Sequence, residues 1–459
     1  MVRQLAPSVY HQVVLYLPQN TLLLPSLLHL TLRVTSPSDI PHALPFLNSN
    51  IKHIDLSIRN TIPEAASYLF SEMKARVPKV QHLALSCDMA MATFEESLLA
   101  YITRLRSSLK EIVLDRYCLT SGMSLRLAQT PSIEKISTHY SNRAAAQQNG
   151  STGMWISHQP NGWSRLKKVA LASNLGFTSA VSLGVGHPRL VQELQLTIPI
   201  SPFNFHSESE LRCALVNISR TYVVLESLFL DLLGPTSVQD SISFDTLEPL
   251  GACRSLKKLF IRHRNPVQLN SSQLDQLLHF WPGLRAINIC VDPVHTNQSA
   301  RGLPIRVLAI FARHCPKIEH IGLQFDDSVP SSVWNLDLRL DSLKTLHVGW
   351  SGVGDVMEVA SYLAELCNTR MEIKFGDSAI IPYSNQRAKE VEKEGRWQEV
   401  GRMFRAFARA RERIIAQLQD RDKGIRWWQI RKTPVEDVVE GSKEEEMEDQ
   451  SWASSLSDQ

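Results

Sequence analysis

The chain has 459 residues, of which 43% are hydrophobic and 21% are charged, and its formal net charge is +3. The composition excludes a chain that is disordered throughout, and the mild charge by itself indicates neither a nucleic-acid nor a membrane partner. The chain is longer than a domain with a single compact hydrophobic core normally is, so we expect several domains or one extended array of repeats.

The cysteines and the apolar runs restrict the cellular setting. Seven cysteines are scattered along the chain without a C-x-x-C pair, which predicts reduced, packed thiols in a cytoplasmic or nuclear protein. No uninterrupted apolar core follows Arg3, so no signal peptide is expected. No apolar run approaches the roughly 18 residues that a membrane span requires, so we expect no transmembrane segment.

An apolar-x-x-apolar-x-apolar phrase recurs along most of the chain, at a mean interval of about 29 residues. Each copy predicts a short, half-buried strand. A last strand is expected at Ile373–Phe375. A weaker copy, which ends in Thr138, begins at Ile133. The eleven complete copies begin at Leu27, Ile51, Val80, Leu109, Leu166, Val191, Leu225, Leu256, Leu284, Ile318 and Leu343.

The segments between these phrases carry apolar residues three or four positions apart, which predicts helices. Prolines recur where each helix should pass into the next strand, because proline ends a helix and favours extended chain before it. The clearest predicted helices are Pro63–Val77, Phe94–Arg106, Glu208–Ser219, Ser272–Phe280 and Asp355–Cys367.

Short strand, turn, helix and return at this period are typical of a leucine-rich repeat. We therefore predict an α/β solenoid, a horseshoe of about thirteen parallel strands with helices outside. The asparagine or cysteine expected after each strand is mostly missing, and Cys87 is the nearest candidate. The expected parts are an N-terminal flanking segment (1–20), an irregular repeat domain (21–380) with an inserted loop (140–163), a basic amphipathic helical segment (381–432) and a disordered acidic tail (433–459).

The residues between the apolar positions of each strand should point to the concave face of the sheet, because side chains alternate along a strand. Phe229 and Phe260 should lie side by side there, flanked by Asp231, Lys258 and Arg262. Such exposed aromatics resemble the hot spot of a protein interface. Alternatively, the inserted loop or a neighbouring side chain covers them.

Three histidines, His29, His53 and His82, should form a second ladder on the same face, and His320 should face a partner further along. Three imidazoles in register suggest zinc. We favour no metal and no cofactor, because a flat ladder does not surround one point tetrahedrally and no carboxylate or cysteine is expected to complete the site.

Gly349-x-x-Gly352-x-Gly354-Asp355 superficially suits a phosphate loop but lacks the Walker lysine and the full dinucleotide spacing. We interpret it as a turn in which Asp355 caps the following helix. No nucleophile, histidine and acid phrase with recognisable context occurs, so we expect no enzymatic activity.

The segment Arg387–Lys432 carries fourteen Lys and Arg against seven Asp and Glu. Basic residues among aromatics suit nucleic acid or an anionic membrane surface. We favour a helix that covers the end of the array, because helical spacing places Trp397, Val400, Phe404, Phe407, Ile414 and Leu418 on one apolar stripe. The tail Glu436–Gln459, with nine acids and one lysine, partly offsets the charge.

The irregular P-x-L-x-x-L-x-L units, the phrase Leu346-His-Val-Gly-Trp and the run Arg396-Trp-Gln-Glu-Val400 resemble the F-box/leucine-rich-repeat proteins of mushroom-forming fungi. The resemblance implies a substrate-recognition adaptor of a cullin-type ubiquitin ligase, with an N-terminal F-box that docks on the ligase linker subunit. Leu5–Pro18 resembles the first helix of an F-box, and the first strand follows at Leu27. The F-box is therefore expected to be missing or truncated here.

The concave sheet should measure roughly 60 Å by 10 Å, about 600 Å2, which approaches the roughly 800 Å2 that each partner contributes to a standard protein interface. We therefore expect a protein partner on that face. The alternatives are a leucine-rich-repeat scaffold with no ligase connection, and a nucleic-acid or membrane-surface binder that acts through the basic C-terminal segment.

Overall fold

The computed structural model describes residues 23–115, 118–139, 162–172, 190–198, 207–232, 242–263, 265–291, 302–328, 338–376 and 387–431. The flanking segment 1–20, the acidic tail 433–459 and all but the last two residues of the inserted loop 140–163 lie outside these ranges. The chain divides into two compact units, Met1–Ala408 and Arg409–Gln459. Each unit is described by itself.

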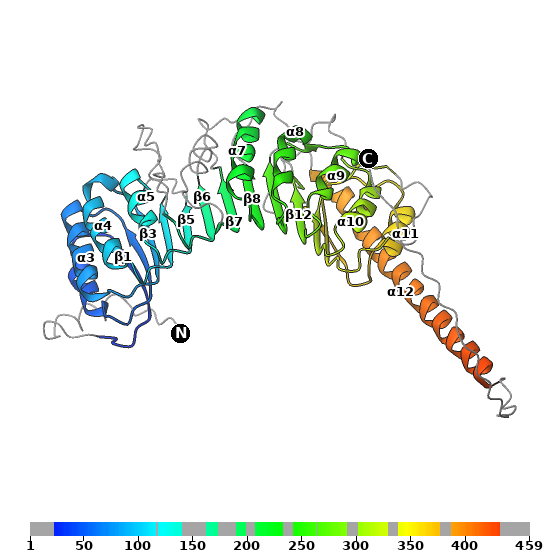
Figure 1. Cartoon of the computed structure of the whole chain (residues 1–459), viewed down its shortest axis with the longest axis horizontal. Coiled ribbons are helices and arrows are strands. Elements are labelled where there is room, and N and C mark those ends of the chain that lie inside the picture. Colours follow the sequence, from blue (N-terminus) through cyan, green and yellow to red (C-terminus); the bar gives the residue numbers. More distant parts are fainter. Residues whose placement is uncertain are drawn as a thin grey trace, which may run out of the picture. The chain divides into compact units, whose positions relative to one another are not determined.

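Thirteen parallel strands of the first unit form one sheet, and they follow one another in sequence order (Figure 1). Each apolar phrase of the sequence lies on its own strand, so the prediction of about thirteen parallel strands is confirmed for the described part of the chain. The strands are β1 (His29–Val34), β2 (His53–Ile58), β3 (His82–Cys87), β4 (Glu111–Asp115), β5 (Lys135–His139), β6 (Lys168–Ala172), β7 (Glu193–Thr197), β8 (Ser227–Leu232), β10 (Lys258–His263), β12 (Ala286–Ile289), β13 (His320–Gly322), β14 (Thr345–Gly349) and β15 (Glu372–Phe375).

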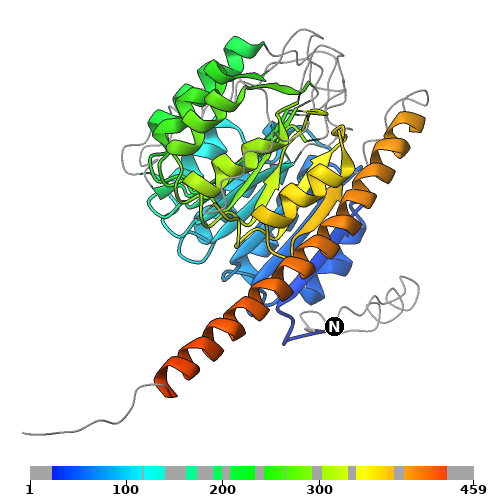
Figure 2. The ribbon, with the colours of Figure 1, turned by 90° about the vertical axis from the view of Figure 1, so that its right-hand side faces the viewer.

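Helices lie along one side of this sheet in Figure 1, and in Figure 2, from the end of the row, strands far apart in the sequence lie one behind another. A separate two-stranded sheet pairs β9 (Ile242–Ser243) with β11 (Val267–Gln268). The described helices are α2 (Asp39–Ala43), α3 (Pro63–Arg76), α4 (Glu95–Arg104), α5 (Ser121–Ala128), α7 (Glu208–Thr221), α8 (Phe244–Leu247), α9 (Ser271–His279), α10 (Leu308–His314), α11 (Val356–Leu366) and α12 (Arg387–Arg431).

Local sequence explains where these helices begin and end. Ser207 and Glu210 form a capping box at the start of α7, and Asn270 and Gln273 form another at the start of α9. Pro78 opens the two-residue turn that follows α3 and precedes β3. The five predicted helices are present within two residues of their expected ends.

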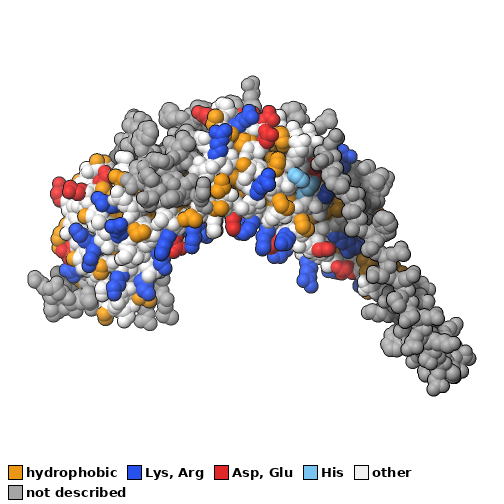
Figure 3. Space-filling view, viewed as in Figure 1, with side chains coloured by type: hydrophobic (Ala, Val, Ile, Leu, Met, Phe, Trp, Pro, Cys, Tyr) orange, Lys and Arg blue, Asp and Glu red, His pale blue; other side chains and the backbone are white. Residues whose placement is uncertain are grey.

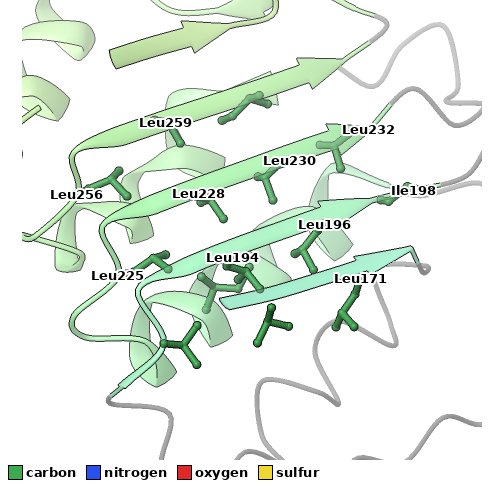
Figure 4. Close-up of a cluster of buried hydrophobic side chains, with 14 of the residues drawn as sticks. Leu171, Leu194, Leu196, Ile198, Leu225, Leu228, Leu230, Leu232, Leu256 and Leu259 are labelled. Atoms are coloured by element: carbon green, nitrogen blue, oxygen red, sulfur yellow. The ribbon is translucent and has the colours of Figure 1, made fainter. Parts of the chain in front are cut away.

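The core lies between the sheet and the helices and is built from one side of every strand. Leu194, Leu228 and Leu259 occupy the same register position on β7, β8 and β10, and all are buried (Figure 4). Alternate residues point the other way, because the side chains of a strand alternate between its faces. Each repeat therefore buries its apolar residues against the next repeat, as a solenoid-like fold requires.

The units are also joined through the backbone before each strand. The carbonyl oxygen of Lys52 accepts hydrogen bonds from the N–H groups of Gln81 (2.8 Å) and His82 (3.0 Å). Lys110 repeats the pattern and accepts from Glu134 and Lys135 of the following unit. This repetition holds neighbouring strands in one register, which fixes the residues that lie side by side on the sheet.

Polar side chains near the strand ends bind backbone N–H groups of neighbouring repeats. Asp115 accepts a hydrogen bond from the N–H of Cys87 (2.7 Å), and Thr138 accepts one from Ala172 (2.8 Å). Ser351 accepts one from Phe325 (2.7 Å). These buried side chains pair backbone donors that would otherwise be costly to bury. Because the three residues are of different types, the sequence alone does not show that they make similar contacts.

The first turns of α12 belong to the first unit and pack against the end of the repeat. Trp397, Val400 and Phe404 are buried, and the indole N–H of Trp397 donates to the carbonyl of Ser351 (3.1 Å). Because of this packing, the first unit extends to Ala408, beyond the boundary expected near residue 380.

The described part of the second unit is the continuation of α12, from Arg409 to Arg431. The predicted apolar stripe is wrong in this part, because Ile414 and Leu418 are each 56% exposed. Helical spacing therefore marked a stripe longer than the buried one.

Candidate functional site

The side of the sheet opposite the helices is covered by no helix of the first unit among the described residues (Figure 1). We call it the open face. It carries the first, third and fifth residues of the strands, such as His53, Asp55 and Ser57 of β2. The parallel register places the same positions of successive strands side by side, so the open face is a set of rows that run across the sheet.

Phe229 and Phe260 lie side by side in the third-position row, as predicted. The register of β8 and β10 pairs them, and their ring centroids are 6.2 Å apart with an interplanar angle of 37°. Tilted rings at this separation are favourable for an aromatic pair. Both side chains are half-buried, so they are less exposed than the sequence suggested.

Charged residues border the pair on both sides. The register places Asp231 beside Arg262, and the Arg262 guanidinium lies 3.4 Å from the Asp231 carboxylate. Lys258 is exposed at the first position of β10, beside Ser227 of β8. The five predicted residues Phe229, Asp231, Lys258, Phe260 and Arg262 therefore form one group, which we call the phenylalanine cluster.

The three N-terminal histidines also lie in one row, as predicted. His29 and His53 have ring centroids 5.2 Å apart, and those of His53 and His82 are 5.7 Å apart. We call these residues the histidine row. His320 does not join either group, since it pairs with Ala286 and Thr345 near the other end of the sheet. It is exposed there.

Two carboxylates lie beside the histidines, although no metal-binding group forms among the described residues. One oxygen of Asp55 is 3.4 Å from Nε2 of His29, and the other is 3.6 Å from Nε2 of His82. Glu111 on the next strand is 3.2 Å from Nδ1 of His82 and 2.5 Å from the ammonium group of Lys135. The sequence held the signal, because Glu111 and Lys135 occupy the same strand position as the histidines.

The surroundings of the row shift the pKa values of His53 and Glu111. Burial lowers the pKa of His53, and the neighbouring His29 and His82 lower it further because like charges repel. Burial opposes ionisation of Glu111, but hydrogen bonds and charge attraction from Lys135 and His82 outweigh it and lower the pKa of this carboxyl. His53, the central residue of the row, therefore resists protonation.

A second feature missed by the sequence analysis lies at the edge of the sheet where the strands begin. Arg285, Lys317, Lys344 and Arg370 line a shallow hollow there, together with Glu319. Glu319 pairs with Lys344 (2.5 Å) and with Arg285 (3.7 Å). Figure 3 shows that Lys and Arg side chains gather with Asp and Glu along part of this rim.

Other chemical sites have little geometric support. Among the described residues, no group of three or more His, Cys, Asp or Glu is placed to hold a metal ion. Burial raises the pKa of the Cys87 thiol to about 12 and that of Cys253 to about 11, so neither is an activated nucleophile. No described helix combines the length and apolar character needed to cross a membrane.

The glycine-rich turn after β14 acts as predicted. Gly349 has a φ of +52°, and a Cβ at this position would lie only 2.0 Å from the carbonyl oxygen of Val291. Asp355 accepts a hydrogen bond from the N–H of Glu358 (2.9 Å) at the start of α11. The interpretation as a turn with a helix cap is therefore confirmed.

Comparison of the chain with models of known protein families and with curated proteins finds no match to either.

Proposed function

We propose that this protein is a non-catalytic protein-binding repeat protein of the leucine-rich-repeat type, whose open face holds a protein partner. The observation that carries this proposal is the phenylalanine cluster on the open face. Half-buried aromatic side chains beside an arginine are the usual centre of a protein interface, because they add large contact area with little further loss of side-chain freedom.

The surrounding charges support the same function. The ion pair between Arg262 and Asp231 lies on one side of the rings, and Lys258 lies on the other. An apolar centre with a polar border excludes water from the centre of a complex while its rim remains solvated. A broad, open sheet face suits an extended surface of a protein better than a small metabolite, which needs an enclosing pocket.

The experiment compares the wild type with the double variant Phe229→Ala and Phe260→Ala. Proximity labelling and affinity capture from the native cell identify a partner, and its Kd is then measured with purified proteins. The double variant should bind at least about 30-fold more weakly, since a hot spot contributes about 2 kcal/mol or more. Tyr68→Ala is the matched control, because Tyr68 is 49% exposed on α3. An unchanged Kd in the double variant would contradict the proposal.

By resemblance, we further propose that the partner is the substrate of a cullin-type ubiquitin ligase and that this chain is its substrate-recognition adaptor. Capture of the protein should then recover the ligase linker subunit or the cullin along with the substrate. Repeated capture of a partner without either subunit would instead favour a leucine-rich-repeat scaffold with no ligase connection.

We place the protein in the cytoplasm or nucleus. No disulfide joins the seven cysteines, each of which the structure describes, and six of them are buried. This number of cysteines without a disulfide suits a reducing compartment. Fluorescence microscopy of a tagged full-length chain tests this location, and a secreted protein would contradict it.

A further inference from the structure

The histidine row has a different chemistry from the phenylalanine cluster, and nothing in the proposed function accounts for it. His29 and His53 are exposed, and His82 is half-buried. Their rings stand 5.2 Å and 5.7 Å apart on three successive strands. His29 and His82 contact Asp55, but no carboxylate among the described residues lies within ion-pair distance of His53. The central imidazole of the row therefore forms no ion pair with a described carboxylate, and Asp55 and Glu111 act on it only from a greater distance.

Protonation would reverse the charge of this part of the open face. The fixed charges on the open positions of β1–β5 are two positive, on Arg33 and Lys135, and three negative, on Asp55, Glu111 and the buried Asp115. Their sum is −1 when the histidines are neutral and becomes +2 when the three histidines of the row each carry a proton.

An anion placed over the row would remove the repulsion that resists protonation. Neighbouring imidazolium rings repel one another, and among the residues that the structure describes only Asp55 and Glu111 form ion pairs with the row. Glu111 is already shared with Lys135. Additional carboxylates would therefore favour proton uptake, and by linkage proton uptake would favour the carboxylates.

The spacing suits an extended polypeptide that crosses the strands. Alternate side chains of an extended chain lie roughly 6.6–6.8 Å apart on one side. Two acidic side chains at this spacing would each reach a gap between adjacent rings of the histidine row. A metal ion fits less well, since no group of three ligands among the described residues is placed to hold one.

We propose that the histidine row binds an acidic segment of the protein partner, with acidic residues at alternate positions, and that binding is coupled to proton uptake by the row. The inference rests on the proposed function in one respect, namely that the occupant is a protein. It adds a second contact area at the N-terminal end of the open face and makes the affinity depend on pH.

The test uses a fluorescein-labelled octa-aspartate peptide and the full-length protein. Fluorescence polarisation at constant ionic strength should give a Kd at least about tenfold lower near pH 5.5 than near pH 7.5, because histidine titrates in this range. Isothermal titration near pH 6 in two buffers of different ionisation enthalpy should show a net uptake of protons on binding.

Variants assign the effect to the row. The triple variant His29→Gln, His53→Gln and His82→Gln should lose the pH dependence, and His53→Gln alone should reduce it. His320→Gln is the matched control, because His320 is exposed at the same strand position but stands apart from the row. Circular dichroism establishes that each variant is folded, and the single variant preserves the test if the triple variant does not fold.

Three results would overturn the inference. They are an affinity that does not change with pH, the same pH dependence in the triple variant, and a preference for a single-stranded RNA of equal charge over the peptide. The variant Phe229→Ala with Phe260→Ala should leave the octa-aspartate titration unchanged. The peptide experiment can thus fail while the phenylalanine cluster still binds its partner. Conversely, the peptide can bind the histidine row even if the phenylalanine cluster binds no partner.

Discussion

The phenylalanine cluster and the histidine row lie on the open face of the same sheet, and both are formed by residues that the strand register places side by side. They differ in the solvent exposure of their side chains. Phe229 and Phe260 are half-buried against each other, whereas His29 and His53 are exposed and His29 pairs with the Asp55 carboxylate. One backbone frame therefore supports an apolar contact and an ionic one, and side-chain chemistry alone makes the difference.

The largest expected effect tests whether the buried side chains beneath the two groups contribute equally to stability. Leu228, beneath the phenylalanine cluster, and Ile54, beneath the histidine row, are completely buried. Leu228→Ala and Ile54→Ala should each lower the free energy of unfolding by about 2–5 kcal/mol, because each leaves a cavity. Urea denaturation followed by circular dichroism measures the loss. Leu28→Ala, at a site 53% exposed, is the control and should change little.

The next effect compares how much stability the two groups gain from apolar contacts. Phe229→Ala should lower the free energy of unfolding by about 1–2 kcal/mol, because a half-buried ring loses part of its contact with apolar neighbours. A double-mutant cycle with Phe260→Ala should give a coupling of about 0.5–1.5 kcal/mol. His53→Ala, as the comparison, should stay within about 0.5 kcal/mol of the wild type. If Phe229→Ala and His53→Ala lowered the free energy of unfolding equally, the two groups would not differ in apolar contact.

A smaller effect concerns the border of the phenylalanine cluster. The pair formed by Arg262 and Asp231 is partly exposed, with 39% and 18% of the respective side chains accessible. A double-mutant cycle with Arg262→Gln and Asp231→Asn should give a coupling of about 0.2–1 kcal/mol, and the coupling should weaken in high salt. A coupling that is independent of salt would contradict this assignment.

The smallest effect concerns pH and belongs to the histidine row. The folded protein holds the pKa of His53 below its ordinary value, so the unfolded chain binds this proton more readily. Stability is therefore present above the unfolded pKa near 6.5 and falls as the pH drops below it. His53→Gln should lose less stability than the wild type between about pH 7 and pH 5.5, by less than about 1 kcal/mol because the ring is exposed.

The measurement is the urea midpoint of wild type and variant at the two pH values. His320→Gln should keep the pH dependence of the wild type, because His320 has no histidine beside it in the register. If both variants responded alike, the lowered stability in acid would not come from the repulsion within the histidine row.

The sequence predicted the groups on the open face better than their surroundings. Phe229 and Phe260 could be paired in advance, because both occupy the same position of one apolar phrase and the repeat fixes the register. Asp55 was visible two residues after His53, yet its reach to both His29 and His82 was missed. That reach depends on the close spacing of three strands, which no single repeat contains.

By itself, the sequence determined the parallel sheet, the side of each strand that is buried and the residues that share a row, because the apolar phrase marks both strand and register. Only the tertiary structure decided which polar side chains close the strand ends, as Asp115, Thr138 and Ser351 do. It also decided that the apolar stripe of α12 is buried at Trp397 but exposed at Ile414. Periodicity shows which side chains lie on one face of an element, but burial depends on whether another part of the chain packs against that face.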